Sequence, residues 1–481
     1  MHSIDSFYIG GTQVQPRSDR YLDVVAPRNE RTIGRVPLAS VEDIDRAVAS
    51  ARTAFDSGLW SKRAPAERAV VLRNLAQHIE DHQREIVELT VEELGIPITS
   101  AELSAPSAAR IVRTYAQLAE SMEFEEERLT PLSRSVVIRE PVGVVVAIPA
   151  WNGPLTLGLQ KVGAALAAGC TVVWKVPVES PLTSYLFATW LQDSGVPDGV
   201  VNVVSADVSE SEYLVAHPAV DMVSFTGSTA VGRRIAAACG KDLRRVALEL
   251  GGKSAAIVLE DADLATVVPA IVNASVAFRQ GEACTAQTRI LLPRSRYEEG
   301  VQAFAGEVSS LRVGDPFDRV TRIGPLVNKK HRERVEGYIR LGREEGASIV
   351  AGGARPSHLP TGWYVEPTLF ANATNDMTIC REEIFGPVAA VIPHDGIDDA
   401  IAIANDSPYG LAGTVWTQNT DDAIRVAREV RTGTFCVNGY LVDPHTPFGG
   451  FKSSGIGREL GPEGIDEFTE LKSILVEPRV G

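Results

Sequence analysis

The stretch from residue 135 to residue 252 alternates short apolar runs with helix-like segments, and this alternation constrains the fold more than any other feature of the sequence. The runs are rich in valine and other β-branched residues, whereas apolar residues in the intervening segments recur at helical spacing. The strand-like runs are SVVIREPVGVVVAIPA, TVVWKVP, VVNVVS, VDMVSFTGS and RRVALELGG. Such alternation predicts an α/β fold with a parallel sheet covered by helices on both faces.

A second unit of the same kind follows further along the chain. Strand-like and helix-like runs resume after residue 284 and continue to the run GTFCVN at 433–438. A chain of 481 residues is too long for one hydrophobic core, so we expect two or three domains. Near the N-terminus, Ser40 precedes a helical pattern at 41–55, and a second long helical pattern covers 66–94.

Composition argues against several kinds of partner. The net charge of −15 provides no basic field to neutralise nucleic-acid phosphates. No apolar run is long enough to span a membrane, and the N-terminus MHSIDSFYIGG lacks the basic start and apolar core of a signal peptide. The five cysteines lie far apart and are odd in number. This usage indicates a reduced, cytoplasmic protein without a disulfide framework and without a metal site.

One cysteine lies in a distinctive setting. Cys284 is found in RQGEACTAQTR, between the helix-like run at 264–278 and the strand-like run at 289–293. A lone cysteine is more often buried and inert than reactive. A thiol held at a turn between two rigid elements can also be a nucleophile, and local sequence leaves both interpretations open.

Two strand ends have features that suit a nucleotide ligand. In FTGSTAVG, Gly227 lets the backbone approach a ligand closely, and Ser228 begins a helix whose free N–H groups favour a pyrophosphate. A structural turn explains the same residues equally well. Lys175, at the end of the run TVVWKVP, could bind ribose hydroxyls or phosphate, although a solvated charge is the commoner case.

Two further strand ends offer groups for catalysis. Glu249 ends an apolar run and precedes two glycines, so burial there would raise its pKa and suit it to general-base work. It could equally cap nearby backbone. Asn152, in PAWNGP, carries a neutral donor suited to a developing oxyanion, or is an ordinary turn residue.

Taken together, these stretches resemble segments of the aldehyde dehydrogenase superfamily, in the same order along nearly the whole chain. The matching segments are PAWNGP, WKVP, FTGSTAVG, LELGGK, GEACTA, EEIFGPV and PFGGFKSSGIGRE. The resemblance implies that Cys284 attacks an aldehyde and that Asn152 stabilises the oxyanion. It further implies that Glu249 activates the water that hydrolyses the thioester, and that Glu459 supports proton transfer. The implied reaction oxidises an aldehyde to a carboxylic acid with a nicotinamide cofactor.

The resemblance also implies which residues hold the cofactor. Asn438 and Lys452 match residues that line the site. The cofactor-binding residues it implies are Lys175, Gly227, Ser228, Gly232, Glu383, Phe385, Trp151, Ile148 and Leu250. In one respect the chain departs from the family pattern, because Val178 occupies the register of an acidic residue that normally accepts ribose hydrogen bonds and repels a 2′-phosphate. Discrimination against NADP is therefore weaker; NAD is still expected as the cofactor, with NADP as a second one. Ala150 replaces a common proline, which we expect to have a mild effect.

The implied architecture is a Rossmann-like dinucleotide-binding domain at 1–122 and 141–251 and an α/β catalytic domain at 252–453. A small β oligomerisation arm and C-terminal segment would cover 123–140 and 454–481, with the final strand pairing with a neighbouring subunit. A homodimer or homotetramer is expected. The sequence does not identify the aldehyde.

Three alternatives stay open at this stage. One is a cysteine acyltransferase or hydrolase without redox chemistry, for which only His331 lies within fifty residues of Cys284 as a candidate base. Another is a CoA-acylating relative, against which Glu249 argues. The third is a non-catalytic protein that keeps the fold.

Overall fold

A computed structural model describes residues 2–478 of the chain. Its first large unit contains an eight-stranded sheet whose five central strands, β12, β11, β8, β9 and β10, run parallel. In spatial order the strands are β20 (Gly455–Ile456), β12 (Arg245–Glu249), β11 (Met222–Thr226), β8 (Val144–Ile148), β9 (Thr171–Val176), β10 (Val201–Ser205), β2 (Phe7–Ile9) and β3 (Thr12–Val14). The parallel sheet that the sequence predicts is confirmed.

Helices cover both faces of this sheet. On one face α1 (Val41–Asp56) packs on β8, β9 and β10, and Ser40 caps it through a capping box with Asp43. On the other, α6 (Pro154–Ala168) packs on β8 and β9, with α2 (Pro65–Asp81) and α5 (Ser104–Ser121) against it. The remaining helices of this unit are α3 (Gln83–Leu94), α4 (Ile98–Ala101), α7 (Leu182–Ala188), α8 (Val208–Ala216) and α9 (Thr229–Lys241).

Some elements differ from the sequence prediction. The pattern at 66–94 is two helices, α2 and α3, because His82 leaves the helical region at φ −105°, ψ 20° and its ring stacks on Trp190 at 4.6 Å. The run at 135–150 is also two strands, which belong to different sheets. Gly143, at φ 129°, lies between them where a Cβ would be 1.8 Å from the Asp221 carboxylate.

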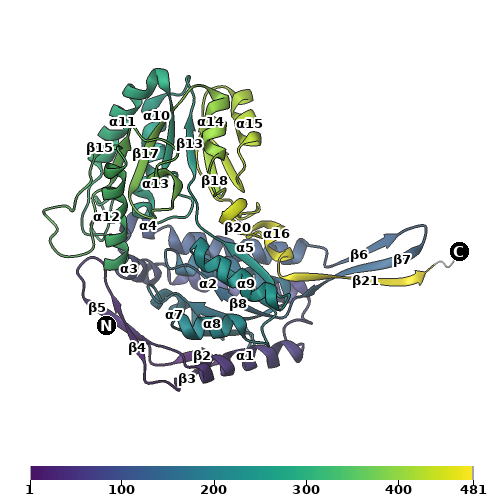
Figure 1. The fold of residues 1–481 in the computed structure, drawn as a ribbon. Coiled ribbons are helices and arrows are strands. Elements are labelled where there is room, and N and C mark those ends of the chain that lie inside the picture. The colour runs from purple at the N-terminus through teal and green to yellow at the C-terminus, as the bar shows by residue number, and fades with distance from the viewer. Residues whose placement is uncertain (1, 479–481) are drawn as a thin grey trace.

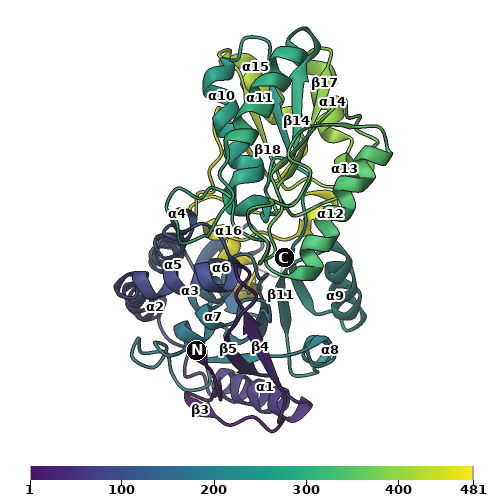
Figure 2. The ribbon, with the colours of Figure 1, turned by 90° about the vertical axis from the view of Figure 1, so that its left-hand side faces the viewer.

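The second large unit contains a seven-stranded sheet with its own apolar clusters on its two faces. Its strands, in spatial order, are β15 (Ser348–Ala351), β16 (Thr368–Ala371), β17 (Val388–His394), β14 (Arg289–Pro293), β13 (Ala255–Val258), β18 (Ala412–Trp416) and β19 (Thr434–Val437). Its helices are α10 (Leu264–Val272), α11 (Tyr297–Ser310), α12 (Lys329–Glu344), α13 (Thr378–Arg381), α14 (Ile397–Asn405) and α15 (Thr420–Glu429). The two units form separate lobes, one above the other (Figures 1 and 2).

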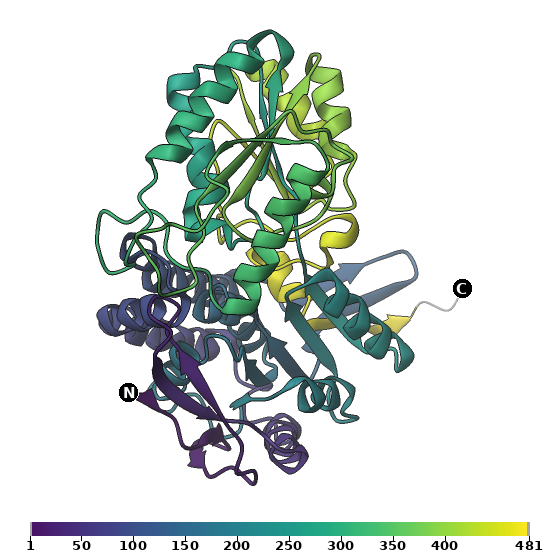
Figure 3. The ribbon, with the colours of Figure 1, turned by 60° about the vertical axis from the view of Figure 1, so that its left-hand side comes forward.

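Two small sheets complete the chain. A three-stranded sheet of β6 (Glu125–Leu129), β7 (Ser133–Pro141) and β21 (Thr469–Pro478) projects away from both lobes (Figures 1 and 3). Near the N-terminus, β1 (His2–Ser3), β5 (Thr32–Pro37) and β4 (Tyr21–Val25) form the other. The final strand pairs with β7 of its own chain, and pairing with a neighbouring subunit stays a prediction.

The segment between β19 of the second lobe and β21 of the projecting sheet returns to the sheet of the first lobe. β20 adds to its edge beside β12, and α16 (Gly461–Asp466) packs on α5 and α6. Residues 455–466 therefore lie against the first lobe, and the domain bounds stay predictions. Among the helices of residues 2–478, none combines the length and apolarity needed to cross a bilayer.

Candidate active site

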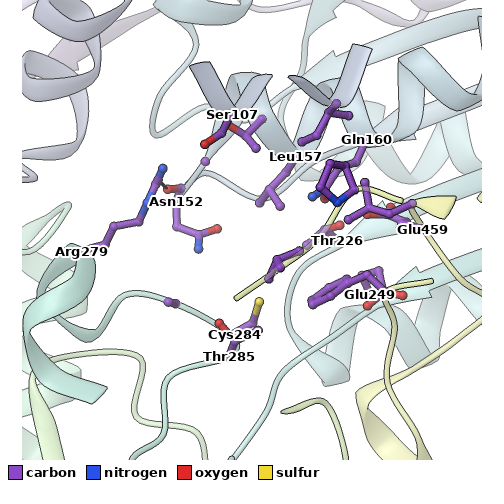
Figure 4. A pocket seen from close by; sticks show the side chains of 18 of the residues that line it. Ser107, Asn152, Leu157, Gln160, Thr226, Glu249, Arg279, Cys284, Thr285 and Glu459 are labelled. Carbon is purple, nitrogen blue, oxygen red and sulfur yellow. Dashed lines mark hydrogen bonds between the residues drawn. The ribbon is translucent and has the colours of Figure 1, made fainter. Parts of the chain in front are cut away.

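A cavity of about 250 Å³ contains the four residues for which the sequence predicts catalytic roles. Asn152, Glu249, Cys284 and Glu459 all line it, although they come from separate parts of the chain (Figure 4). Its other walls come from α5, from the start of α6 and from the segment that includes Val442 and Pro444. The structure therefore brings the predicted catalytic residues together.

The loop at residues 278–284, called the thiol loop below, contains a sharp backbone turn before Cys284. After α10 and one π-helical turn at Asn273–Ala277, the chain enters the left-handed region at Arg279 (φ 49°), Gln280 (φ 44°) and Gly281 (φ 72°). A Cβ at Gly281 would lie 2.2 Å from the Gly386 carbonyl oxygen, so this close approach requires glycine. Cys284 follows this turn and reaches the cavity.

Cys284 is half-buried and faces the cavity. Burial raises the pKa of its thiol to about 12, and the neighbouring carboxylates of Glu383 and Glu249 add to this rise. Backbone hydrogen bonds from Cys284 and Thr285 act in the opposite direction. In the cofactor-free protein the thiol is therefore mostly protonated at neutral pH.

Asn152 lies between β8 and α6, where Pro154 begins the helix. Its side chain is buried, and Nδ2 donates a hydrogen bond to the Glu282 carbonyl oxygen at 3.0 Å. An amide nitrogen carries two N–H groups, so one is left to face a ligand. Figure 4 shows the side chains of Asn152 and Cys284 entering the same cavity.

Glu249 ends β12 and is 4% exposed. Burial raises its pKa well above the ordinary value, and the charge of Glu459 raises it further, whereas Lys161 and Arg458 oppose the rise. Its Oε2 atom is buried without a hydrogen-bond partner among residues 2–478. A carboxyl group in this state can accept a proton from a bound water.

Behind Glu249, Lys161 and Glu459 form an ion pair, and both side chains are buried. The sequence alone assigns Lys161 no role in the site. Its position in the sequence could have indicated a buried charge, because the helical run at 155–169 is otherwise apolar around most of its circumference. A lysine inside such a helix requires a partner.

The predicted adenosine-binding and pyrophosphate-binding residues lie at the carboxyl edge of the first sheet, where doubly wound sheets bind ligands. Lys175 is the penultimate residue of β9 and makes no hydrogen bond to any residue of 2–478. Burial lowers its pKa, and the charge of Glu179 opposes this. Ser228 caps α9, accepting a hydrogen bond from the Val231 N–H at 3.4 Å. A Cβ at Gly232 would be 2.4 Å from Leu250, so α9 packs closely on the strand end.

The remaining predicted cofactor residues come from both lobes. Glu383 accepts a hydrogen bond from the Gly252 N–H at 3.1 Å, and burial raises the pKa of this carboxyl group to about 7. Phe385 has φ 63°, and its ring meets Trp151 edge-on at 5.4 Å. Ile148 ends β8 and is buried.

Two expected site residues lie elsewhere. Asn438 exchanges hydrogen bonds with the backbone of Thr417, and Lys452 donates to the carbonyl oxygens of Asn405 and Ser407. Neither is among the residues that line the cavity. Their side chains join loops instead, and their role elsewhere in the site stays a prediction.

Comparison with known proteins identifies the class. Residues 14–474 match the model of the Aldehyde dehydrogenase family, so the chain belongs to this family and has its fold. Among curated relatives, a geranial dehydrogenase of Castellaniella defragrans is 46% identical over 471 residues, covering 98% of each chain. A 3-succinoylsemialdehyde-pyridine dehydrogenase of Pseudomonas sp. is 40% identical over 479 residues, covering 99% of each.

Solved structures agree with this assignment. A Mycobacterium tuberculosis aldehyde dehydrogenase complexed with NAD+ superposes with a TM-score of 0.98 at 45% identity, covering 100% of this chain and 99% of that one. An aldehyde dehydrogenase C mutant from Pseudomonas syringae, complexed with NAD+ and octanal, gives a TM-score of 0.95 at 40% identity. That match covers 98% of this chain and 96% of the other.

Proposed function

We propose that this protein oxidises an aldehyde to the carboxylic acid with a nicotinamide cofactor, through a covalent intermediate on Cys284. One observation carries the proposal: Cys284, Asn152, Glu249 and Glu459 line a single cavity. The NAD+ complexes of the similar structures support the choice of cofactor.

The first step forms a bond between the Cys284 sulfur and the aldehyde carbon. The carbonyl oxygen takes up negative charge, and the Asn152 amide and the Cys284 backbone N–H donate hydrogen bonds to it. Loss of one such donor typically costs about 3–4 kcal/mol in the transition state. The product of this step is a thiohemiacetal on Cys284.

The residues of the first sheet's edge fit a dinucleotide. The Lys175 ammonium group, which makes no hydrogen bond within residues 2–478, suits ribose hydroxyls, and the N-terminus of α9 at Ser228 suits a pyrophosphate. Glu383 and Phe385 would hold the nicotinamide ribose and ring. The bound cofactor supplies a hydride acceptor, which side chains lack. The NAD+ complexes of the similar structures support NAD as the preferred cofactor, and we propose NADP as a second one because Val178 carries no charge to repel a 2′-phosphate.

Loss of a hydride from the thiohemiacetal carbon to the nicotinamide acceptor would leave a thioester on Cys284, and the second half of the reaction hydrolyses it. Glu249 takes a proton from water, whose oxygen attacks the acyl carbon, and the carbon–sulfur bond breaks to return the Cys284 thiolate. The raised pKa of Glu249 suits it to hold that proton briefly. Glu459 and Lys161 would pass it on, since both lie beside Glu249.

The walls of the cavity point to an apolar aldehyde. They include side chains that offer hydrocarbon surface over most of the cavity: Leu103, Ile111, Leu157, Phe278, Val442 and Phe448. Apolar pockets with few polar groups select apolar ligands. Octanal in the similar Pseudomonas syringae structure, and the geranial dehydrogenase name of the Castellaniella relative, fit this class.

The hydrolase alternative loses its candidate base. His331 Nε2 lies 2.5 Å from the Phe385 carbonyl oxygen and 3.6 Å from a Glu282 carboxylate oxygen, and His331 does not line the cavity. The His331 ring therefore makes its polar contacts outside the cavity that contains Cys284. Glu249 in the cavity favours water over CoA as the acceptor of the acyl group.

We also propose a homodimer or homotetramer in a reduced, cytoplasmic setting. Exposed leucines on the projecting sheet support assembly, because an unpaired apolar sheet invites a second copy: Leu129, Leu132, Leu471 and Leu475. All five cysteines are free in the structure.

A direct assay tests the function. The protein is mixed with a panel of apolar aldehydes and NAD, then NADP, and the absorbance of reduced nicotinamide is followed with and without CoA. We expect CoA-independent reduction by wild type and none by Cys284→Ala, which should still bind NAD. Absence of reduction across the panel would contradict the proposal.

A further inference from the structure

Three hydrogen bonds join the Asn152 loop to the thiol loop in a closed ring. A guanidinium nitrogen of Arg279, Nη1, donates to the Asn152 carbonyl oxygen. The Asn152 side chain donates to the Glu282 carbonyl oxygen at 3.0 Å, and the Glu282 N–H donates back to the Arg279 carbonyl oxygen at 2.9 Å. Figure 4 shows Arg279 reaching across to Asn152. The ring thus fixes Asn152 relative to a residue two positions before Cys284.

The Arg279 guanidinium lies beside an aromatic ring at the wall of the cavity. It lies over the Phe278 ring at 5.6 Å and lines the cavity. Within residues 2–478 it has no carboxylate within ion-pair distance, and its one hydrogen bond goes to Asn152. Burial lowers its pKa to about 10, so it stays charged at neutral pH, and it attracts the Cys284 sulfur when that is ionised.

The backbone at Arg279 is strained, and neighbouring bonds keep it so. Left-handed conformations are energetically costly for residues other than glycine. The Gln280 side chain holds the turn by donating to the Pro325 carbonyl oxygen at 3.0 Å and to a Glu282 carboxylate oxygen at 3.1 Å. The other Glu282 carboxylate oxygen accepts from the Val327 N–H at 3.0 Å. A strained turn held this firmly directs the Arg279 side chain to one place.

We propose that Arg279 is a positioning residue for the oxyanion donor: it holds the Asn152 amide beside Cys284, and its charge favours the thiolate. This rests on the proposed function. Displacement of the amide weakens the hydrogen bond to the developing oxyanion, and loss of the nearby cation makes the sulfur harder to ionise.

Three substitutions separate charge from position. Arg279→Lys keeps the charge, Arg279→Gln keeps a hydrogen-bond donor without the charge, and Arg279→Met removes both. Arg244→Met is the matched control, because Arg244 is also a buried guanidinium that donates to carbonyl oxygens, those of Val215 and His217, and it does not line the cavity.

Two readouts are followed in each variant. The first is the rate at which iodoacetamide alkylates Cys284 in the cofactor-free protein at fixed pH, located by peptide mass. The second is the first-turnover rate of reduced-cofactor formation. We expect Arg279→Met and Arg279→Gln to slow alkylation about tenfold, which corresponds to one pKa unit. Arg279→Met should also slow the first turnover by about 100-fold, the cost of a misplaced group.

The remaining variants complete the test. Arg279→Lys should keep the alkylation rate and lose part of the first-turnover rate, and Arg244→Met should change neither. Wild-type alkylation in Arg279→Gln overturns the charge role, and this variant decides it even if Arg279→Met does not fold. A wild-type first turnover in folded Arg279→Lys and Arg279→Gln overturns the positioning role. Failure of wild type to reduce any cofactor would contradict the proposed function separately, since alkylation needs no cofactor.

Discussion

The ammonium group of Lys161 and the carboxylate of Glu459 form an ion pair that is closed off from solvent beside Glu249. Burial raises the pKa of Glu249 most; Glu459 raises it further and Lys161 lowers it, so the pair modulates the proton affinity of the proposed base.

Glu459→Gln should shift the pH dependence of thioester hydrolysis. Without the Glu459 charge, and with Lys161 unpaired, the pKa of Glu249 falls, so the base stays ionised to lower pH. The acid limb of the steady-state rate should move to lower pH. Breaking a buried pair by removing one partner should also lower the free energy of unfolding by about 3–5 kcal/mol, measured in urea.

Glu93→Gln is the control for that shift. Glu93 is a buried carboxylate that accepts hydrogen bonds from the Leu182 and Thr183 N–H groups, and it does not line the cavity. Its replacement should leave the acid limb in place. An unmoved limb in Glu459→Gln would show that Glu459 does not tune the base.

Alkylation of Cys284 should rise steadily with pH in the cofactor-free protein. The pKa of the thiol is raised to about 12, so the reactive thiolate increases about tenfold per unit between about pH 6 and about pH 9. Iodoacetamide labelling followed by peptide mass measures this. A plateau in the labelling rate near neutral pH would mean that the pKa of the thiol is lower than burial and the neighbouring carboxylates predict.

Val178→Glu should shift cofactor preference toward NAD. A carboxylate at this half-buried position, near Lys175, which we propose to bind the adenosine ribose, should lower the kcat/KM for NADP relative to that for NAD about tenfold or more, because it would repel a 2′-phosphate. Val178→Leu keeps the volume apolar and should leave the ratio of NADP to NAD activity unchanged. An unchanged ratio in Val178→Glu would place the ribose elsewhere.

Activity should increase with the apolar length of the aldehyde. Each buried CH₂ group contributes about 0.8 kcal/mol, close to fourfold in kcat/KM, until the cavity is filled. An aldehyde with a quaternary ammonium group should be a poor substrate, because Arg279 and Arg110 both line the cavity. A preference for that cation over octanal would contradict the apolar assignment.

Sequence patterns predicted the features that depend on local chemistry. The β-branched runs mark the strands, and Ser40 marks the start of the capped helix α1. Glu249 and Lys175 could be placed near strand ends because the strands themselves were predictable. The break at His82 does not, because it accompanies a stack with Trp190, far along the chain. Such tertiary contacts override helical periodicity.

The site shows the same division. The resemblance located Cys284 and Asn152, but nothing local marks Arg279 as a partner of Asn152, since 127 residues separate them. Lys161 was visible only as a charge in an apolar helix, and its partner Glu459 lies 298 residues away. Contacts of this kind arise only when segments far apart in the sequence meet in the folded chain.

Detection of an acyl-enzyme in the Glu249→Gln variant tests the proposed mechanism most directly. This variant should take aldehyde through one turnover and then stall, because its amide cannot accept the proton of water. After mixing with octanal and NAD, a burst of reduced cofactor should be followed by a slow steady state. Peptide mass spectrometry should find the acyl group on Cys284. Full steady-state activity without a burst, or an acyl group on another residue, would contradict the account.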